Sequence, residues 1–226
     1  MNLPKDMDES RIGADPRRLT GRKMNSPPEN DTSEYLDLPL REFLDLVASG
    51  GPAPGGGSVA AVTVALAAGL SGMAARLSAD QLAAGLADRA DALRRRVEPL
   101  ARADAESYRR VLDAYRLPRG PDPETRRERV RDALSGAADV PLAVAEVGNE
   151  VAVIAARLVE EGNPNLEGDA VTAVLLAEAG VRAAAALVEI NLSSAEMEDN
   201  RLGRANELVD EIAATVRRVT GGDVRG

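Results

Sequence analysis

The residues best suited to bind a ligand form a glycine-rich turn, Gly55-Gly56-Gly57-Ser58, which leads into an alanine-rich segment that ends near Ala75. Glycine permits positive φ and leaves no Cβ over the turn, and Ser58 is expected to cap the first free amides of the following helix. Amides at a helix N-terminus suit an anionic or carbonyl-bearing ligand. A plain loop before a capped helix explains the same residues, so the turn alone does not define a site.

Asp104 occupies a position where the surrounding pattern calls for an apolar residue. It falls between Leu100 and Tyr108 in a stripe that repeats every three or four residues, as in a helix that faces a core. An unpaired buried carboxylate is costly, and burial raises its pKa toward the range of a general base. The alternatives are a salt bridge with a nearby arginine such as Arg102, or a helix rotated so that Asp104 faces water.

Glu178 presents a similar case in a later segment. It shares an apolar stripe with Val174, Val181 and Ala185. Two acids on stripes that face the core predict a polar pocket among helices.

The composition limits which kinds of chemistry are available. The chain contains no cysteine and no histidine, which excludes disulfides, thiol nucleophiles, imidazole acid–base catalysis and the usual zinc or haem ligands. Carboxylates, amides, hydroxyls and basic side chains remain, and no metal is expected. The net charge of −9 at pH 7 argues against a general nucleic-acid binder, which normally shows a basic surface.

The elements that must position these residues are all predicted to be helices. Aromatic residues make up only 2% of the chain, so the core must consist of small aliphatic side chains, which favours closely packed helices. The fold class is therefore predicted as all-α, an up-and-down bundle of long alanine-rich helices that dimerises to gain core. The expected helices are 59–75, 82–115 with a kink at Pro99, 124–139, 141–161, 170–192 capped by Asp169, and 195–219.

The first 34 residues differ from the rest of the sequence. Residues 1–34 mix proline with polar residues and lack apolar periodicity, so they are interpreted as a disordered N-terminal leader, and 35–226 as one helical domain. The leader has no apolar core of a secretory signal, and cytoplasmic residence is expected. The charge-free interval 46–75 is broken by prolines and is short of strongly apolar residues, so no membrane span is expected.

Several short motifs occur in an order that resembles the cyclodeaminase/cyclohydrolase family. The resemblance covers residues 35–219 and rests on the combined order and spacing of the motifs. They are Leu40-Arg-Glu-Phe-Leu44, Pro52-Ala-Pro-Gly-Gly-Gly-Ser58, Asp104-Ala-Glu-Ser-Tyr108, Tyr115-Arg-Leu-Pro118, Pro141-Leu-Ala-Val-Ala-Glu146, Gly162-Asn163 followed by Asp169, and Ile190-Asn191-Leu192.

The resemblance implies an all-helical subunit, usually dimeric, that binds a reduced folate in a cleft associated with the subunit interface. Asp104 falls on the position of the family's catalytic aspartate. No cofactor beyond the tetrahydrofolate substrate is implied, and no metal. By the same resemblance the residues that would bind substrate are Gly55, Gly56, Gly57 and Ser58, with Asn163, Asp169 and Glu178 as second candidates.

The activity expected from the resemblance is hydrolysis of 5,10-methenyltetrahydrofolate to 10-formyltetrahydrofolate. The absence of a formiminotransferase domain favours this hydrolase over the alternative, a formiminotetrahydrofolate cyclodeaminase that releases ammonia. A second alternative is a catalytically weakened relative that binds folate or serves in assembly.

The chain also departs from the family pattern. The departures, at Asp80, Gln81, Gly168 and Leu187, favour the weakened relative. Relatives often carry a basic and aromatic group near Asp80, so a possible anchor for the folate tail is missing. The remaining candidates for that contact are Arg116, Arg119, Arg126 and Arg127.

Overall fold

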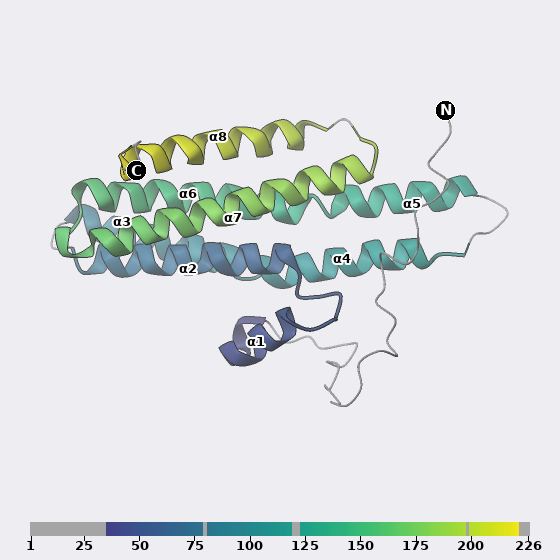
Figure 1. Ribbon diagram of the computed structural model, residues 1–226, viewed down its shortest axis with the longest axis horizontal. Helices are drawn as coiled ribbons and strands as arrows, with labels where there is room; N and C mark the ends of the chain where they lie inside the picture. The colour runs from purple at the N-terminus through teal and green to yellow at the C-terminus, as the bar shows by residue number, and fades with distance from the viewer. Residues whose placement is uncertain (1–34, 79–80, 119–122, 198, 222–226) are drawn as a thin grey trace, which may run out of the picture.

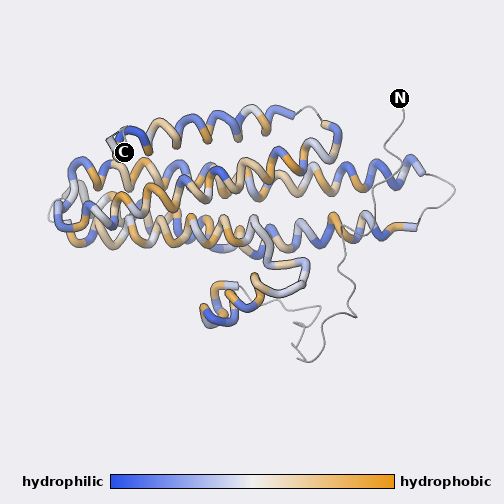
Figure 2. The backbone as a smooth tube through the Cα atoms, in the orientation of Figure 1, coloured by the Kyte–Doolittle hydropathy of each residue, from blue (hydrophilic) through white to orange (hydrophobic). Residues whose placement is uncertain are grey.

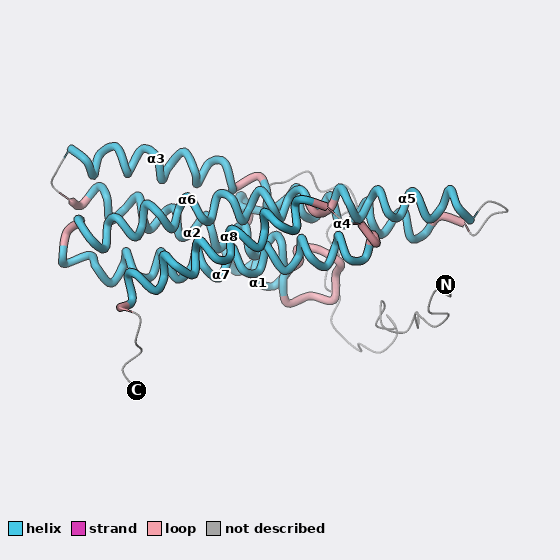
Figure 3. Tube along the Cα trace, turned by 90° about the horizontal axis from the view of Figure 1, so that it is seen from above, coloured by secondary structure: helices cyan, strands magenta, loops and turns pink. Residues whose placement is uncertain are grey.

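The computed structural model describes residues 35–78, 81–118, 123–197 and 199–221, so the expected leader lies outside it. Within these ranges the chain forms helices and no strand, which confirms the all-α prediction (Figure 3). The elements are η2 (Tyr35–Asp37), α1 (Leu40–Val47), α2 (Gly56–Arg76), α3 (Gln81–Val97), α4 (Leu100–Arg116), α5 (Pro123–Gly136), α6 (Asp139–Glu161), η3 (Pro164–Leu166), α7 (Glu167–Ser194) and α8 (Asn200–Thr220).

Five helices, α2, α3, α6, α7 and α8, run side by side along the long axis of the molecule (Figure 1). α4 begins against α2 inside the bundle and continues beyond it, where it pairs with α5 as a projecting arm. The arm is more hydrophilic than α2 and α7, as Figure 2 shows. The small helix α1 lies to one side and is joined to α2 by the glycine-rich turn.

α2 lies in the interior of the bundle, where it packs against α3, α4, α6 and α7. Its small side chains allow close approach: Val64 lies between two glycines, Gly148 of α6 and Gly180 of α7. A Cβ added at Gly148 would lie 3.2 Å from Val64 Cγ2, and one added at Gly180 would lie 2.5 Å from the same atom. The three helices therefore meet at a contact that leaves little room for adjustment.

Two helical segments, Gly56–Arg76 and Pro164–Ser194, are long and apolar enough to cross a membrane by length and composition alone. In the bundle, 61% of the most apolar window of the first segment and 44% of that of the second are buried against other parts of the chain. Core helices of this length and composition pass the same test.

The predicted helix 82–115 is wrong as a single element, because α3 ends at Val97 and α4 begins at Leu100. Pro99 has no N–H to continue the helical ladder, and its ring clashes with the preceding turn, so it acts as the cap residue of α4. Asp104 therefore lies near the beginning of a helix.

Two other predicted helix starts are also wrong. α7 begins at Glu167 with Leu166 as its cap residue, which places Asp169 inside the first turn. α8 begins at Asn200, where the Asp199 side chain accepts a hydrogen bond from the amide of Arg201. Its C-terminus is as predicted, since Gly221 adopts the left-handed conformation that ends many helices.

Arg201 anchors the start of α8 to the junction of α5 and α6. Its guanidinium donates to the Ser135 carbonyl at 2.8 Å and to the Ser135 hydroxyl at 2.7 Å, and it pairs with Asp199 at 2.6 Å. Hydrogen bonds from the side chain and the backbone amide of Arg201 lower the pKa of Asp199 to about 2. Arg201, in the first turn of α8, therefore holds the base of the projecting arm in place.

Candidate active site

Asp104 of α4 lies at the N-terminus of α2. Its Oδ2 accepts a hydrogen bond from the Ser58 amide at 3.0 Å and lies 3.4 Å from the Ser58 hydroxyl. α2 begins at Gly56 with Gly55 as its cap residue, so Ser58 stands in the first turn. The prediction that Ser58 caps this helix is therefore wrong, because a carboxylate from another helix accepts from the amide instead.

Gly57 makes this contact between α2 and α4 possible. A Cβ added at Gly57 would lie 2.0 Å from Asp104 Oδ1 and 2.3 Å from Asp104 Cγ, far inside van der Waals distance. The second residue of α2 must therefore be a glycine for the carboxylate to occupy its observed place.

The environment of Asp104 raises its pKa. The side chain is partly buried, and this desolvation outweighs the opposing effect of the two Ser58 hydrogen bonds. Among the described residues, no arginine lies within ion-pairing distance of Asp104; Arg102 pairs with Glu106 at 2.8 Å. The salt-bridge alternative and the fully solvated alternative are both excluded, and a carboxylate of raised pKa remains.

The backbone before Gly57 is open. A Cβ added at Gly55 would meet no atom within 4 Å, and one added at Gly56 would meet only Leu187 Cδ1, at 3.9 Å. In the described part of the chain, the amides of Gly56 and Gly57 make no hydrogen bond. The amide of Gly56, an exposed residue, therefore lies near the Asp104 carboxylate where a ligand can reach it, whereas Gly57 is buried.

The sequence analysis did not predict the positions of two residues near this junction, Leu187 and Tyr108. Leu187, noted only as a departure from the family pattern, lies next to Gly56. Tyr108 was placed on the core-facing stripe, but it is 42% exposed and follows Asp104 by one helical turn. Only its exposure distinguishes Tyr108 from a core residue, and exposure cannot be read from the sequence.

The second candidates do not join Asp104 within one subunit. The Asn163 side chain donates to the Leu77 carbonyl, and its backbone amide donates to the Ser78 hydroxyl, at the opposite end of α2. The length of α2 puts about 30 Å between Asn163 and Gly57. Asp169 lies at the same far end, in the first turn of α7.

Glu178 lies between these two ends. Its carboxylate accepts from Arg182 Nε at 2.8 Å on the same helix. Leu187, at the level of Gly56, is nine residues further along α7, or about 13 Å. The pocket predicted from two acids is therefore not formed by Asp104 and Glu178 together.

The arginines proposed for the folate tail are mostly engaged elsewhere. Arg126 donates to the carbonyls of Tyr115 and Leu117 and so closes the end of α4. Arg127 pairs with Glu124 and Arg116 with Asp113, both on the protein surface. Arg119 and the departure at Asp80 lie outside the described residues, and Gly168 lies at the far end, at the start of α7.

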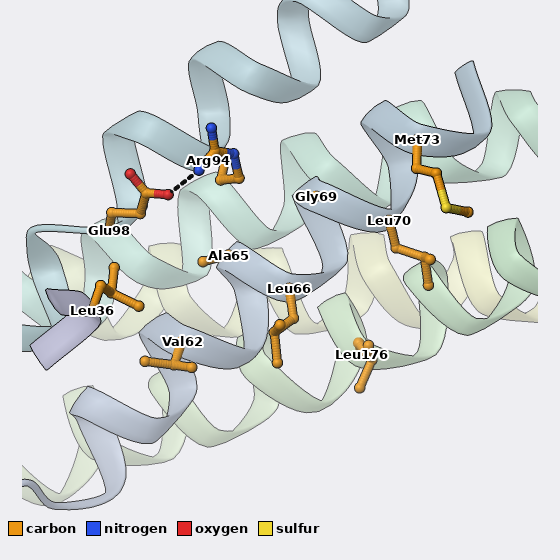
Figure 4. Close-up of a pocket in the computed structure, with 10 residues that line it drawn as sticks. All are labelled: Leu36, Val62, Ala65, Leu66, Gly69, Leu70, Met73, Arg94, Glu98 and Leu176. Carbon is orange, nitrogen blue, oxygen red and sulfur yellow. Dashed lines mark hydrogen bonds and ion pairs between the residues drawn. The ribbon is translucent and has the colours of Figure 1, made fainter. Parts of the chain in front are cut away.

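An apolar groove of about 540 Å³ runs along the outer side of α2, which sequence reasoning also did not predict. Its one charged pair, Arg94 with Glu98, lies on one rim (Figure 4). The apolar lining consists of Leu36, Val62, Ala65, Leu66, Gly69, Leu70, Met73 and Leu176. We call this feature the α2 groove.

In the described part of the chain, no group of three or more acidic side chains gathers as a metal site. The prediction that the site needs no metal stays a prediction. The junction offers one partly buried carboxylate, the amide of the exposed Gly56 and open space beside Gly55. Such a set can move a proton and stabilise charge on an oxygen atom.

The protein is an all-helical bundle in which a carboxylate lies against a glycine-rich helix start. Comparison with known proteins identifies the family that has this architecture. Residues 39–212 match the model of the formiminotransferase-cyclodeaminase family, and the chain belongs to this family. This confirms the resemblance seen in the sequence motifs.

Three individual proteins are similar to this chain. A methenyltetrahydrofolate cyclohydrolase of Methylorubrum extorquens is 35% identical over 193 residues, which are 80% of this chain and 93% of the relative. The formimidoyltransferase-cyclodeaminase of Rattus norvegicus is 32% identical over 74% of this chain, which spans about a third of the rat protein. The crystal structure of a formiminotetrahydrofolate cyclodeaminase from Thermotoga maritima matches with a TM-score of 0.74 and 29% identity, over 83% of this chain and 96% of that one.

Proposed function

We propose that this protein hydrolyses 5,10-methenyltetrahydrofolate to 10-formyltetrahydrofolate, with Asp104 as the general base. The observation that carries the proposal is the partly buried Asp104 carboxylate, of raised pKa, at the open N-terminus of α2. The Methylorubrum extorquens relative, named a cyclohydrolase and covered over 93% of its length, supports this reaction.

The chemistry begins with a water molecule that attacks the cationic carbon between N5 and N10 of the substrate. Asp104 takes one proton from the water as the C–O bond forms, and returns it to N5 as the C–N5 bond breaks. The remaining hydroxyl proton is released, and the oxygen becomes the formyl oxygen on N10. The amide of the exposed Gly56 is placed to stabilise charge on this oxygen, and Gly55 leaves space for the ring system.

The second candidate function is a formiminotetrahydrofolate cyclodeaminase, which the similarity to the Thermotoga maritima structure favours. In that reaction N10 closes on the formimino carbon and ammonia leaves. The same carboxylate would move the protons. A catalytically weakened folate-binding relative is the third alternative.

Two assays on the purified chain separate the three functions. We expect loss of the near-ultraviolet absorbance of 5,10-methenyltetrahydrofolate faster than in buffer alone, because a positioned general base typically adds a factor of about 10²–10⁴. A rate equal to the buffer rate, together with ammonia release from 5-formiminotetrahydrofolate, would indicate the cyclodeaminase. Folate binding without either reaction would leave the weakened relative.

We also propose that the protein acts as a homodimer that buries the outer faces of α2 and α7. Leu66 on α2 is 61% exposed, and Ile190 on α7 is 58% exposed. Large exposed apolar patches mark interaction sites, and the α2 groove continues this one. The exposed large apolar side chains within α2 and α7 are Val59, Leu66, Leu175 and Ile190.

Leu66→Glu is expected to shift the protein from dimer to monomer at micromolar concentration, because the carboxylate would be desolvated in the interface. Sedimentation velocity measures the change. Val153→Glu places the same charge on an exposed apolar position of α6 and is expected to stay dimeric. A wild-type monomer, or a Leu66→Glu dimer, would contradict the proposal.

We further propose that the protein works in the cytoplasm, without a membrane or nucleic-acid partner. The net charge of −9 supports this, since it disfavours both nucleic acid and anionic lipid surfaces. The reaction needs no cofactor beyond the tetrahydrofolate substrate.

A further inference from the structure

We propose that Ser58 positions the Asp104 carboxylate and does not bind substrate. The proposal rests on the proposed function, in which Asp104 is the general base. The family resemblance places Ser58 among the substrate-binding residues, whereas its contacts in the structure are all with α4.

The Ser58 side chain is completely buried, with 0% of its surface exposed. Its hydroxyl donates to the backbone carbonyl of Ala101 at 2.7 Å, and its own amide donates to Asp104 at 3.0 Å. Ser58 is thus joined to α4 at two points that are three residues apart. These two bonds set both the height and the rotation of α4 against the first turn of α2.

A role as a substrate ligand requires an exposed polar atom, and Ser58 has none. To reach a folate, the hydroxyl would have to leave the Ala101 carbonyl and pass the Gly57 backbone. Breaking a buried hydrogen bond for that purpose costs free energy, whereas the amide of the exposed Gly56 makes no hydrogen bond to the described residues. The substrate contact therefore belongs to the Gly56 amide.

The charge state of Asp104 depends on the same residue. Both hydrogen bonds from Ser58 favour the ionised carboxylate and so oppose the effect of burial on its pKa. Among the described residues of α2, α4 and the helices packed on them, no charged side chain contributes to this balance. Weakening the Ser58 contacts therefore raises the pKa of the carboxyl.

Ser58→Ala is expected to lower kcat by about 10- to 100-fold while KM stays within about twofold, since a displacement near 1 Å is enough for such a loss. The acidic limb of the pH–rate profile is expected to move to higher pH. Ser71→Ala is the matched control: Ser71 is also fully buried on α2, but its hydroxyl bonds to Ala67 of the same helix. We expect this control to keep the wild-type rate and pH profile.

Three outcomes would overturn the proposal: a raised KM with unchanged kcat, unchanged kinetics, or equal losses in both variants. If Ser58→Ala does not fold, Ser58→Cys keeps a weaker donor at the same position and should give a smaller change of the same kind.

A second measurement separates this proposal from the proposed function. If the wild type proves inactive, NMR titration of ¹³C-labelled aspartates, with Asp104 assigned from Asp104→Asn, still reports its pKa. A higher value in Ser58→Ala than in the wild type and Ser71→Ala supports positioning, and equal values contradict it.

Discussion

Asp104→Asn is expected to lower kcat for 5,10-methenyltetrahydrofolate hydrolysis by about 10²–10⁴-fold, the range for loss of a general base. Asparagine keeps the size of the side chain and an oxygen that accepts from the Ser58 amide, but it cannot take a proton from water. The measurement is the near-ultraviolet absorbance decay, corrected for the uncatalysed rate. In the wild type the activity should fall at acidic pH, starting above the ordinary titration range of an aspartate, because burial raises this pKa.

The same substitution should not destabilise the protein near neutral pH. Folding raises the pKa of Asp104, so the ionised carboxylate is less favourable in the folded chain than in the unfolded one. This penalty is complete above the folded-state pKa and disappears as the pH falls through the unfolded value. Replacement by asparagine removes it, and the melting temperature at pH 7 is expected to equal or exceed that of the wild type.

A matched control comes from the same helix. Asp113→Asn changes an exposed aspartate that pairs with Arg116 on the projecting arm, and its activity is expected to be unchanged. Full activity in Asp104→Asn, or a loss of the same size in Asp113→Asn, would contradict the role of Asp104.

Gly57→Ala is expected to reduce kcat nearly as much as Asp104→Asn, because the new methyl group would lie 2.0 Å from Asp104 Oδ1 and must push the carboxylate away from Ser58. The backbone of Gly57 is not in the left-handed region, so the expected effect is steric. Gly56→Ala adds a methyl group that meets only Leu187 at 3.9 Å, and should raise stability by about 0.4–1 kcal/mol through the unfolded state. Kinetics and thermal unfolding of both variants provide the comparison.

A double-mutant cycle shows whether Gly57 acts through Asp104. In an Asp104→Ala background the clashing carboxylate is gone, so Gly57→Ala should cost neither further activity nor much stability. Losses that simply add, in both activity and unfolding free energy, would mean that Gly57 has another role.

The fold and the central residue of the site could be predicted from the sequence because both depend on local patterns. The scarcity of aromatic residues and the helical period give the all-α class. The interruption of an apolar stripe singles out Asp104, and the structure places this residue in a partly buried environment.

The partners of Asp104 could not be predicted in the same way, because they depend on which helix ends meet. Ser58 follows the glycines as a cap residue would, yet a carboxylate 46 residues away accepts from its amide. Pro99 was expected to bend a single helix. Instead the chain breaks there, and Asp104 lies near the start of α4. The distance of Asn163 from this junction also depends on the length and direction of α2, which short motifs do not reveal.

Asp104 lies in the inner part of α4, far from the outer end of the projecting arm. α4 enters the bundle at Leu100, and Asp104 follows four residues later, whereas Arg116 at the outer end follows sixteen residues later. At the helical rise these separations are about 6 Å and about 24 Å. Because Ala101 and Asp104 are hydrogen-bonded to Ser58 of α2, a swing of the arm beyond the bundle displaces Arg116 far more than it displaces the Asp104 carboxylate. Movements of the outer arm are therefore expected to leave the position of the carboxylate nearly unchanged.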